Sequence, residues 1–289
     1  MLLVIPLWTI GQANSYELLV LGTAQDAGFP QVDCQSTCCL NVKTEENVAS
    51  IAIVGEKQFW IIDATPNYTE QYTLVKQEYP NHTLGGIFLT HAHIGHYTGL
   101  MYLGREAQGA DSVPVYCMPR MAKFLRENGP WSQLVALGNI DIVELQKSVA
   151  LQLSDQLSVT PWLVPHRDEF SETVGYVIQP TEMSALYIPD IDKWQHWDMD
   201  ITTLISDLDL ALVDATFFSA TELPGRDMSE IPHPFAQETI ELLQPLSEED
   251  KSKVFFTHFN HTNPLIRDGS EADSVRSKGF QLARTGMRL

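Results

Sequence analysis

Three histidines lie within six consecutive residues of this chain. His91, His93 and His96 form a His-x-His-x-x-His pattern directly after the apolar run of residues 86–89. The neutral imidazole is the commonest protein ligand for zinc and related metals, and short loops of this kind are typical of metal ligands. A chance cluster among the nine histidines is the alternative. The pattern predicts half of a metal site, placed at the end of a buried strand.

Further candidate ligands also follow apolar runs. His166 comes after residues 162–165, Asp190 after residues 186–189, and His258 after residues 253–257. Taken alone, such a histidine is usually a surface residue and such an aspartate a helix cap. An α/β protein, however, builds its site by gathering loop residues from the ends of several strands. The set therefore predicts one shared site.

The hydrophobic pattern predicts the elements that must position these residues. Strands are expected at residues 16–21, 48–54, 58–62, 86–89, 113–116, 186–188, 209–213 and 253–256, with several more between 140 and 178. Residues 55–57 are expected to form the turn of a hairpin. Helices are expected at residues 67–79, 97–107, 119–127 and 234–243. Strands alternate with helices in both halves, which indicates an α/β fold.

Length and charge narrow the classes of function. The 289 residues suit one compact domain over residues 14–289, or two closely packed halves. The net charge of −19 argues against nucleic acid or anionic membranes as partners. No apolar stretch in the body of the chain could span a bilayer. We expect a small-molecule substrate, which can carry phosphate because bound dications reverse the local field, and a homodimer stays an open alternative.

The amino terminus has the pattern of a secretory signal. Residues 2–10 are apolar, and Gly11, Gln12 and Ala13 then form a small-x-small cleavage site. This pattern predicts a signal peptide over residues 1–13 and a periplasmic or secreted protein. A basic segment before the apolar run is absent, so an apolar first strand in a cytoplasmic protein is the alternative.

These residues, in this order, resemble the metallo-β-lactamase fold superfamily. Its pattern is His-x-His-x-Asp-His, then a histidine, a bridging aspartate and a final histidine, each after a strand. The resemblance implies an αββα sandwich, with metal ions held between its two sheets by His91, His93, His96, His166, Asp190 and His258. The aspartate of the pattern falls on Gly95, and Asp63 matches an acidic position that supports the first histidine loop.

The resemblance is closer to one branch, which contains coenzyme PQQ biosynthesis protein B and the cyclic phosphodiesterase of phosphonate utilisation. The shared segments are residues 21–31, followed by cysteines, and residues 213–217, 231–234 and 257–264. They extend over nearly the whole chain.

The cysteines do not form a routine Cys-x-x-Cys zinc motif, because Cys38 and Cys39 are adjacent. The resemblance to the phosphodiesterase implies a structural zinc held by Cys34, Cys38, Cys39 and His261. A disulfide from Cys34 to Cys38 or Cys39 is the competing prediction, since an exported protein would allow it. The remaining cysteine, Cys117, is expected to be a buried thiol.

The predicted site can activate water. His91, His93 and His166 make a three-imidazole face, on which zinc lowers the pKa of bound water and supplies hydroxide as a nucleophile. Asp190 would bridge to a second ion held by His96 and His258. Because Gly95 supplies no carboxylate, that second ion would bind weakly or be replaced by iron or manganese.

His233, between two prolines, is a candidate general acid or substrate contact, and a loop residue without a role is the alternative. Asp190 and His233 are thus the expected catalytic residues. The favoured function is a metal-dependent hydrolase that uses metal-bound hydroxide on a phosphodiester, ester or lactone. The alternatives are an enzyme like PQQ biosynthesis protein B, with metal-dependent redox or oxygen chemistry, and a metal-binding protein without turnover.

Overall fold

The computed structural model describes residues 16–289 except 41 and 43, and the predicted signal peptide lies outside the described residues. Strands of this part of the chain form two sheets. The first sheet follows the order of the chain: β1 (Glu17–Gly22), β2 (Ser50–Val54), β3 (Gln58–Ile62), β4 (Thr83–Phe88), β5 (Val113–Cys117) and β6 (Ile140–Glu144). β2 and β3 pair antiparallel, which confirms the predicted hairpin.

The second sheet runs in the order β13-β12-β11-β10-β9-β8-β7. Its strands are β7 (Leu151–Ser154), β8 (Leu157–Leu163), β9 (Val174–Pro180), β10 (Ala185–Ile188), β11 (Leu210–Asp214), β12 (Val254–Thr257) and β13 (Gln281–Leu282). Strands β7 to β10 pair antiparallel, whereas β10 to β13 pair parallel.

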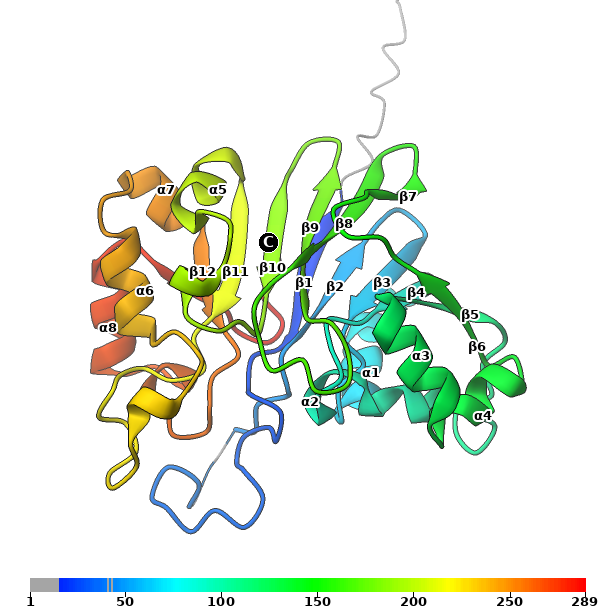
Figure 1. Ribbon diagram of the computed structural model, residues 1–289, viewed down its shortest axis with the longest axis horizontal. Helices are drawn as coiled ribbons and strands as arrows, with labels where there is room; N and C mark the ends of the chain where they lie inside the picture. The colour runs from blue at the N-terminus through cyan, green and yellow to red at the C-terminus, as the bar shows by residue number, and fades with distance from the viewer. Residues whose placement is uncertain (1–15, 41, 43) are drawn as a thin grey trace, which may run out of the picture.

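Helices cover the outer faces of both sheets. The N-terminal half contains α1 (Tyr68–Glu78), α2 (Ile94–Tyr97), the 3-10 helix η1 (Thr98–Leu103), α3 (Pro119–Glu127) and α4 (Trp131–Ala136). The C-terminal half contains α5 (Ile201–Asp207), α6 (Ala236–Leu243), α7 (Glu248–Ser252) and α8 (Ser270–Ser277), with short 3-10 turns η2 (Trp194–His196), η3 (Met228–Glu230) and η4 (Pro264–Ile266). The two helix groups lie on opposite sides of the sheets (Figure 1). None of the described helices is long and apolar enough to cross a membrane.

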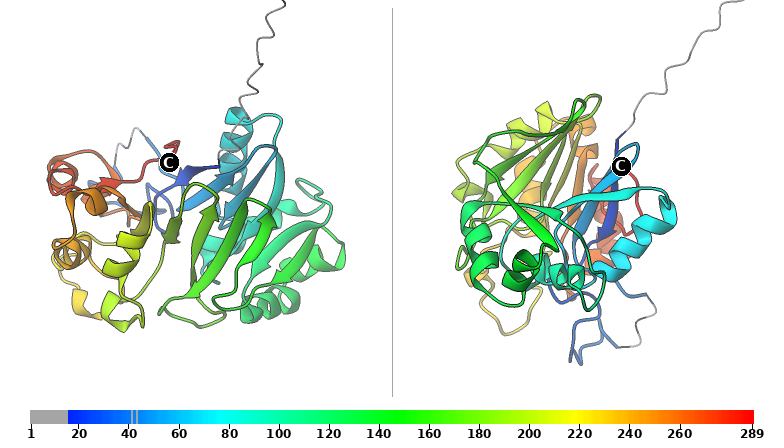
Figure 2. Two further views of the ribbon diagram at one scale, coloured as in Figure 1. Left: turned by 90° about the horizontal axis from the view of Figure 1, so that it is seen from above. Right: turned by 90° about the vertical axis from the view of Figure 1, so that its right-hand side faces the viewer.

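The layers explain why the strands are apolar on both faces. In β1, Leu18 and Val20 pack in the core between the sheets, whereas Leu19 and Leu21 pack in the core shared with the outer helices. A strand buried on both faces reads as a continuous apolar run instead of alternating with polar residues. The second sheet has its own outer core beneath α5, α6 and α8. The result is the predicted αββα sandwich, seen along two further directions in Figure 2.

The predicted helix over residues 97–107 is wrong. The chain forms the short α2 and then the 3-10 helix η1, which ends at Leu103. Glycine is a poor helix former, and this stretch contains Gly99 and Gly104. Gly99 also packs directly on another segment, because a Cβ there would lie 2.1 Å from the backbone oxygen of Thr65. Close packing, and not helix propensity, therefore sets the path after the histidine loop.

Strand direction brings the predicted site residues to one place. β1, β3 and β4 run the same way in the first sheet, because β1 and β3 are both antiparallel to β2 and β4 is parallel to β3. β8, β10, β11 and β12 likewise share one direction in the second sheet. Loops that follow strands of one direction meet at the same edge of a sheet, which is where α/β proteins place their sites.

Candidate metal centre

Five buried side-chain atoms without a hydrogen-bond partner belong to Asp190 and to four residues around it. They are Asp26 Oδ1, His96 Nε2, His166 Nε2, Asp190 Oδ1 and His258 Nε2. Buried polar atoms are almost always paired, so each orphan needs an explanation, and a bound ion is one of them. Nitrogen and carboxylate oxygen are also the atoms that zinc, iron and manganese accept as ligands. These residues therefore fit a metal centre.

The first group of candidate ligands contains His91, His93, His166 and Asp190, whose ligand atoms all lie within 4.8 Å of one another. His91 Nε2 lies 2.8 Å from His93 Nδ1 and 3.5 Å from Asp190 Oδ2. His166 Nε2 lies 3.7 Å from Asp190 Oδ1. All four were predicted from sequence, and the loops after β4, β8 and β10 bring them together.

The second group contains Asp26, His96, Asp190 and His258, again within 4.8 Å. His96 Nε2 lies 3.1 Å from Asp190 Oδ2 and 3.3 Å from Asp26 Oδ1, and His258 Nε2 lies 3.2 Å from Asp190 Oδ2. Asp190 belongs to both groups, as the sequence predicted for a bridging carboxylate. Asp26, in the loop after β1, was not predicted as a site residue.

Asp63, at the end of β3, orients the first histidine loop. Its carboxylate accepts hydrogen bonds from the Thr90 backbone N–H at 2.8 Å and from Thr90 Oγ1, and it lies 2.7 Å from His96 Nδ1. A carboxylate only accepts, so His96 Nδ1 carries the proton and Nε2 points its lone pair at the centre. Because the Thr90 hydroxyl donates to Asp63, it accepts from His91 Nδ1 at 3.0 Å. One carboxylate thus fixes the orientation of both His91 and His96.

Asp214, at the end of β11, does the same in the second sheet. The Thr216 hydroxyl donates to Asp214 Oδ1 at 2.7 Å and therefore accepts from His258 Nδ1 at 2.9 Å. Asp214 Oδ2 lies 2.8 Å from His233 Nδ1, as expected for an aspartate that orders the loop carrying His233. Each sheet consequently has an aspartate and a threonine that together orient two histidines, an arrangement typical of metal-binding histidines.

Partners outside these two units orient the remaining imidazoles. Asp192 Oδ1 lies 3.1 Å from His166 Nδ1, and Glu169 Oε2 lies 3.1 Å from His93 Nε2. Each carboxylate holds a ring proton and leaves the opposite nitrogen as a lone pair. The lone pairs of His91 and His93 then face each other at 2.8 Å, a repulsive contact that a cation between them would relieve.

The electrostatics of the centre also suit metal binding. Burial lowers the pKa of His91, His93 and His258, which favours the neutral form that ligates metals. Burial also opposes a charge on His96, but Asp63, Asp190 and Asp26 outweigh it and raise the pKa of His96 well above its ordinary value. Three carboxylates around one imidazole attract positive charge, which a metal ion can supply in place of a proton.

His233 lies beside the first group. Its Nδ1 is 3.3 Å from Asp190 Oδ1, in addition to its contact with Asp214. Burial opposes its charged form, but Asp214 and Asp190 outweigh burial and raise the pKa of His233 to about 9. Asp214 and Asp190 thus favour the imidazolium form of His233.

Two residues of the centre have backbone conformations that side chains rarely adopt. Asp63 has φ of 70° and His258 has φ of 62°. Such strain costs about 1–3 kcal/mol for a non-glycine residue and is found mainly at functional sites. In Asp63 it accompanies the carboxylate that orients His96, and in His258 it accompanies a ring nitrogen that faces Asp190.

A second cluster joins the loop between β1 and β2 to the loop after β12. Cys34, Cys38, Cys39 and His261 have ligand atoms within 4.8 Å of one another, as predicted for a structural zinc site. The four cysteines of the chain are free thiols in the structure, and the Sγ atoms of Cys38 and Cys39 are 3.9 Å apart. Burial and then the neighbouring Cys34 raise the pKa of Cys39 to about 12. Such thiols ligate metal only as thiolates, so zinc would have to displace their protons.

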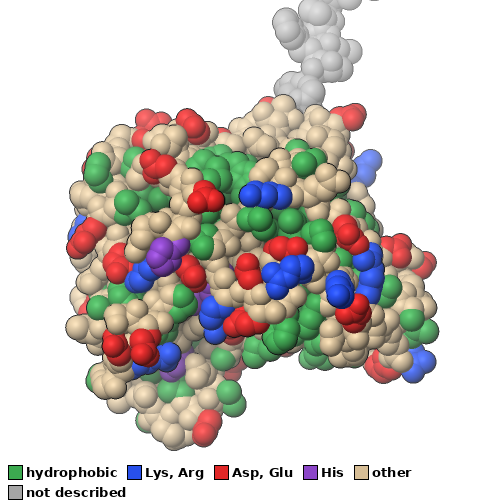
Figure 3. All heavy atoms as spheres, in the orientation of Figure 1, with side chains coloured by type: hydrophobic (Ala, Val, Ile, Leu, Met, Phe, Trp, Pro, Cys, Tyr) green, Lys and Arg blue, Asp and Glu red, His purple; other side chains and the backbone are tan. Residues whose placement is uncertain are grey.

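A hollow of about 270 Å³ opens beside His233. Its lining residues come from four loops: Gln25, Gln31, Arg167, Phe217, Leu223, Arg226, Ile231, Pro232, His233, Asn260 and His261. Acidic side chains are scattered over the face of the molecule shown in Figure 3, with fewer basic ones among them. The chain as a whole is acidic, with 37 acidic and 18 basic residues. The hollow beside His233 differs from this balance, because two arginines, Arg167 and Arg226, line it.

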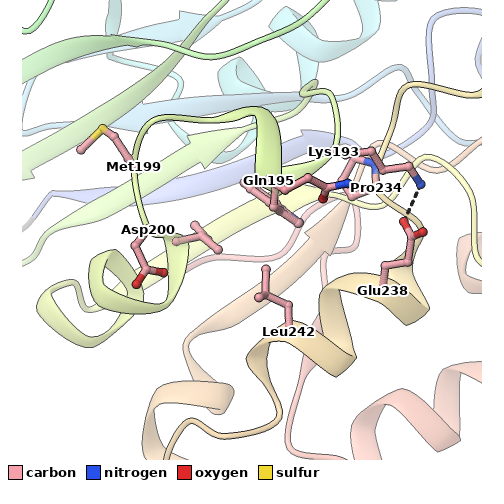
Figure 4. A pocket seen from close by; sticks show the side chains of 9 residues that line it. Lys193, Gln195, Met199, Asp200, Pro234, Glu238 and Leu242 are labelled. Carbon is pink, nitrogen blue, oxygen red and sulfur yellow. Dashed lines mark hydrogen bonds and ion pairs between the residues drawn. The ribbon is translucent and has the colours of Figure 1, made fainter.

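A different hollow of about 340 Å³ lies between α5 and α6 (Figure 4). Met199 and Leu242 line it, and Lys193 pairs with Glu238 at one end. It contains none of the candidate metal ligands. The hollow beside His233 is consequently the better candidate for a substrate.

Residues 60–259 match the beta-lactamase superfamily domain, and the protein belongs to this superfamily. It is similar to the coenzyme PQQ synthesis protein B of Rhizobium meliloti, with 23% identity over 312 residues that cover 97% of this chain and 99% of the relative. The corresponding protein of Acinetobacter baylyi is 26% identical over 310 residues, which cover 93% and 98%. The predicted superfamily and branch are thereby confirmed.

Solved structures confirm the fold. The zinc-bound PqqB of Methylobacterium extorquens has a TM-score of 0.78 at 21% identity, covering 94% of this chain and 99% of that one. A diphosphatase of the PhnP family has a TM-score of 0.65 at 20% identity, covering 95% and 96%. Human short-form tRNase Z has a TM-score of 0.61 at 14% identity, covering 94% and 98%. The fold neighbours thus include hydrolases.

Proposed function

We propose that this protein is a metal-dependent hydrolase of small substrates, with a phosphodiester as the favoured bond and an ester or lactone as alternatives. The observation that supports it most is the convergence of two ligand groups on Asp190. Two ions that share one carboxylate can stabilise both the attacking and the leaving oxygen of a displacement. Zinc is the expected ion, and iron or manganese also suit histidine and carboxylate ligands.

When bound, the ions would polarise the scissile bond and lower the pKa of a water molecule toward neutrality. The side chains have separate tasks around them. His91, His93 and His166 would hold one ion, and Asp190 would hold both. His233 shares its Nδ1 proton with Asp214, and its ring also lines the hollow, where it could give a proton to a leaving group.

The lining of the hollow favours an anionic substrate. Arg167, in the loop after β8, and Arg226, in the loop after β11, both border it. A guanidinium binds phosphate oxygens in pairs and stays charged at any physiological pH. A phosphate group held by these arginines would lie next to Asp190 and its histidines, because His233 is 3.3 Å from Asp190.

The test is turnover of bis-p-nitrophenyl phosphate by protein reconstituted with zinc, manganese or iron. We expect metal-dependent hydrolysis that His93→Ala abolishes. Arg167→Ala should raise the KM for the phosphodiester and leave that for neutral p-nitrophenyl acetate unchanged. Loss of all metal-dependent activity across phosphodiesters, esters and lactones would overturn the proposal and leave a metal-binding protein without turnover.

A second candidate function follows from the curated relatives. Coenzyme PQQ synthesis proteins B match nearly the whole chain, and the histidine and carboxylate ligands would also hold iron for redox or oxygen chemistry. This alternative predicts oxygen consumption by iron-loaded protein and none by zinc-loaded protein. Equal hydrolysis with either metal, without oxygen uptake, would favour the hydrolase.

We also propose that Cys34, Cys38, Cys39 and His261 hold a structural zinc, since four ligands of this kind make a closed tetrahedral site. Protein purified without added zinc should retain it, and unfolding in denaturant with a chelator should release four free thiols and no disulfide. Absence of zinc together with one disulfide would overturn this proposal.

Export to the periplasm or medium remains a proposal on the basis of the apolar residues 2–10. Mass spectrometry of the mature protein should find Asn14 as its first residue. An intact Met1 in protein from the exported fraction would contradict cleavage.

A further inference from the structure

Asp26 occupies the space in which a side chain at position 95 would stand. A Cβ built on Gly95 would lie 2.2 Å from Asp26 Oδ1 and 2.7 Å from the Asp26 Cα. Real Cβ atoms do not approach other heavy atoms this closely, so the two positions cannot both carry a side chain in this arrangement. Asp26 can therefore take this position only because residue 95 is a glycine.

The backbone holds Asp26 firmly in that place. The Gln25 N–H donates to the Phe259 backbone oxygen at 2.8 Å, next to His258, and Ala24 bridges to the same segment. The Gly28 N–H then donates to the Gln25 oxygen at 2.8 Å and closes a turn with Asp26 at its second position. The loop after β1 is thus attached to the loop that carries a candidate metal ligand.

The side chain of Asp26 points into the centre. Its Oδ1 is buried, has no hydrogen-bond partner, and lies 3.3 Å from His96 Nε2. Because Asp63 holds the Nδ1 proton, a neutral His96 presents a lone pair at Nε2. Two acceptors that face each other at this distance, with Asp190 and His258 completing the group, describe a cation position of two oxygens and two nitrogens.

We propose that Asp26 supplies the carboxylate ligand that position 95 lacks, so that the second metal ion is bound by Asp26, His96, Asp190 and His258. This inference rests on the proposed metal-dependent function and refines it. In this arrangement the carboxylate comes from the loop after β1 and fills the space beside Gly95.

The competing explanation is that Asp26 only forms an ion pair with a charged His96. Metal stoichiometry distinguishes the two, since an ion pair contributes nothing to metal content. Asp26→Asn removes the charge and keeps the shape, and Asp33→Asn is the matched control, because Asp33 is an exposed aspartate of the same loop. Gly95→Ala is a second, independent variant, since its methyl group must displace Asp26 without adding a ligand.

Each protein is dialysed against zinc and its metal content measured per chain, with affinities from chelator competition. We expect the D26N and G95A proteins to lose one ion, or to bind it more than ~100-fold more weakly, while the D33N protein equals wild type. In cobalt-substituted protein, D26N should lack the visible absorption bands that the wild type shows for the second ion of the centre. Unchanged stoichiometry and affinity in D26N would overturn the inference. A wild-type chain that binds metal only at the cysteine cluster would instead overturn the proposed function.

Discussion

Asp63→Asn tests whether the metal-facing nitrogen of His96 depends on a buried carboxylate. The substitution keeps the volume, and asparagine tolerates the positive φ of 70° at this position. The amide can still accept from Thr90 with its oxygen, at the positions now 2.8 and 3.0 Å away. Its NH2 group, however, then faces His96 Nδ1, which Asp63 Oδ2 now contacts at 2.7 Å.

The expected loss of metal affinity follows from the tautomer of His96. To accept from the amide, His96 must move its proton to Nε2, the atom that lies 3.1 Å from Asp190. The opposite amide orientation leaves buried groups unpaired, which costs about 1–3 kcal/mol. Either arrangement lowers the affinity for the second ion by about 10–100-fold, which is the usual effect of removing an orienting partner. This loss corresponds to about 1.4–2.7 kcal/mol of binding free energy.

Chelator-competition titrations with zinc resolve the two ions. We expect the D63N protein to keep the first ion at wild-type affinity and to weaken only the second. Asp192→Asn is the matched control, because Asp192 orients His166 in the first group in the same way. It should weaken the first ion and leave the second. A D63N protein with both affinities unchanged, or with both lowered equally, would refute the reasoning from tautomers.

Three further predictions concern separate parts of the molecule. His233→Gln should lower kcat by ~100-fold or more and leave metal content unchanged, which steady-state kinetics and elemental analysis check; an unchanged kcat would exclude proton transfer by His233. Burial raises the pKa of Cys117 to about 12, so a thiol reagent at pH 8 should label Cys117 only after unfolding, as read by peptide mass spectrometry; labelling of the folded protein would contradict its burial. Asp200→Ala removes the cap that accepts from the Thr202 N–H at 2.9 Å and should cost about 1 kcal/mol of unfolding free energy without changing activity; an unchanged Tm would contradict it.

Sequence alone was sufficient to predict the proximity of residues that follow the ends of strands. His166, Asp190 and His258 are far apart in the chain, but each follows an apolar run, and parallel strands carry such residues to one edge. The same reasoning placed most strands within a few residues of their observed ends. The sandwich and the candidate ligands from β4, β8, β10 and β12 were predictable for that reason.

Asp26 was not predictable in this way, because its role depends on how two loops pack. The signal that could have found it was the missing carboxylate at position 95 together with the single acidic residue in the segment 21–30. Arg167 and Arg226 could not be placed either, since the loops that carry them have no regular period. Helix α5 was missed, and the helix over residues 97–107 was wrong, because tertiary packing outweighs propensity in short segments.

Each of the two metal positions that share Asp190 takes half of its ligands from each sheet. Asp26, His91, His93 and His96 follow strands of the first sheet, whereas His166, Asp190 and His258 follow strands of the second. A bound ion is therefore a cross-link between the two layers, and its binding free energy adds to the work of separating them. Metal supply would then decide how long the folded chain resists unfolding and proteolysis, before any substrate is present.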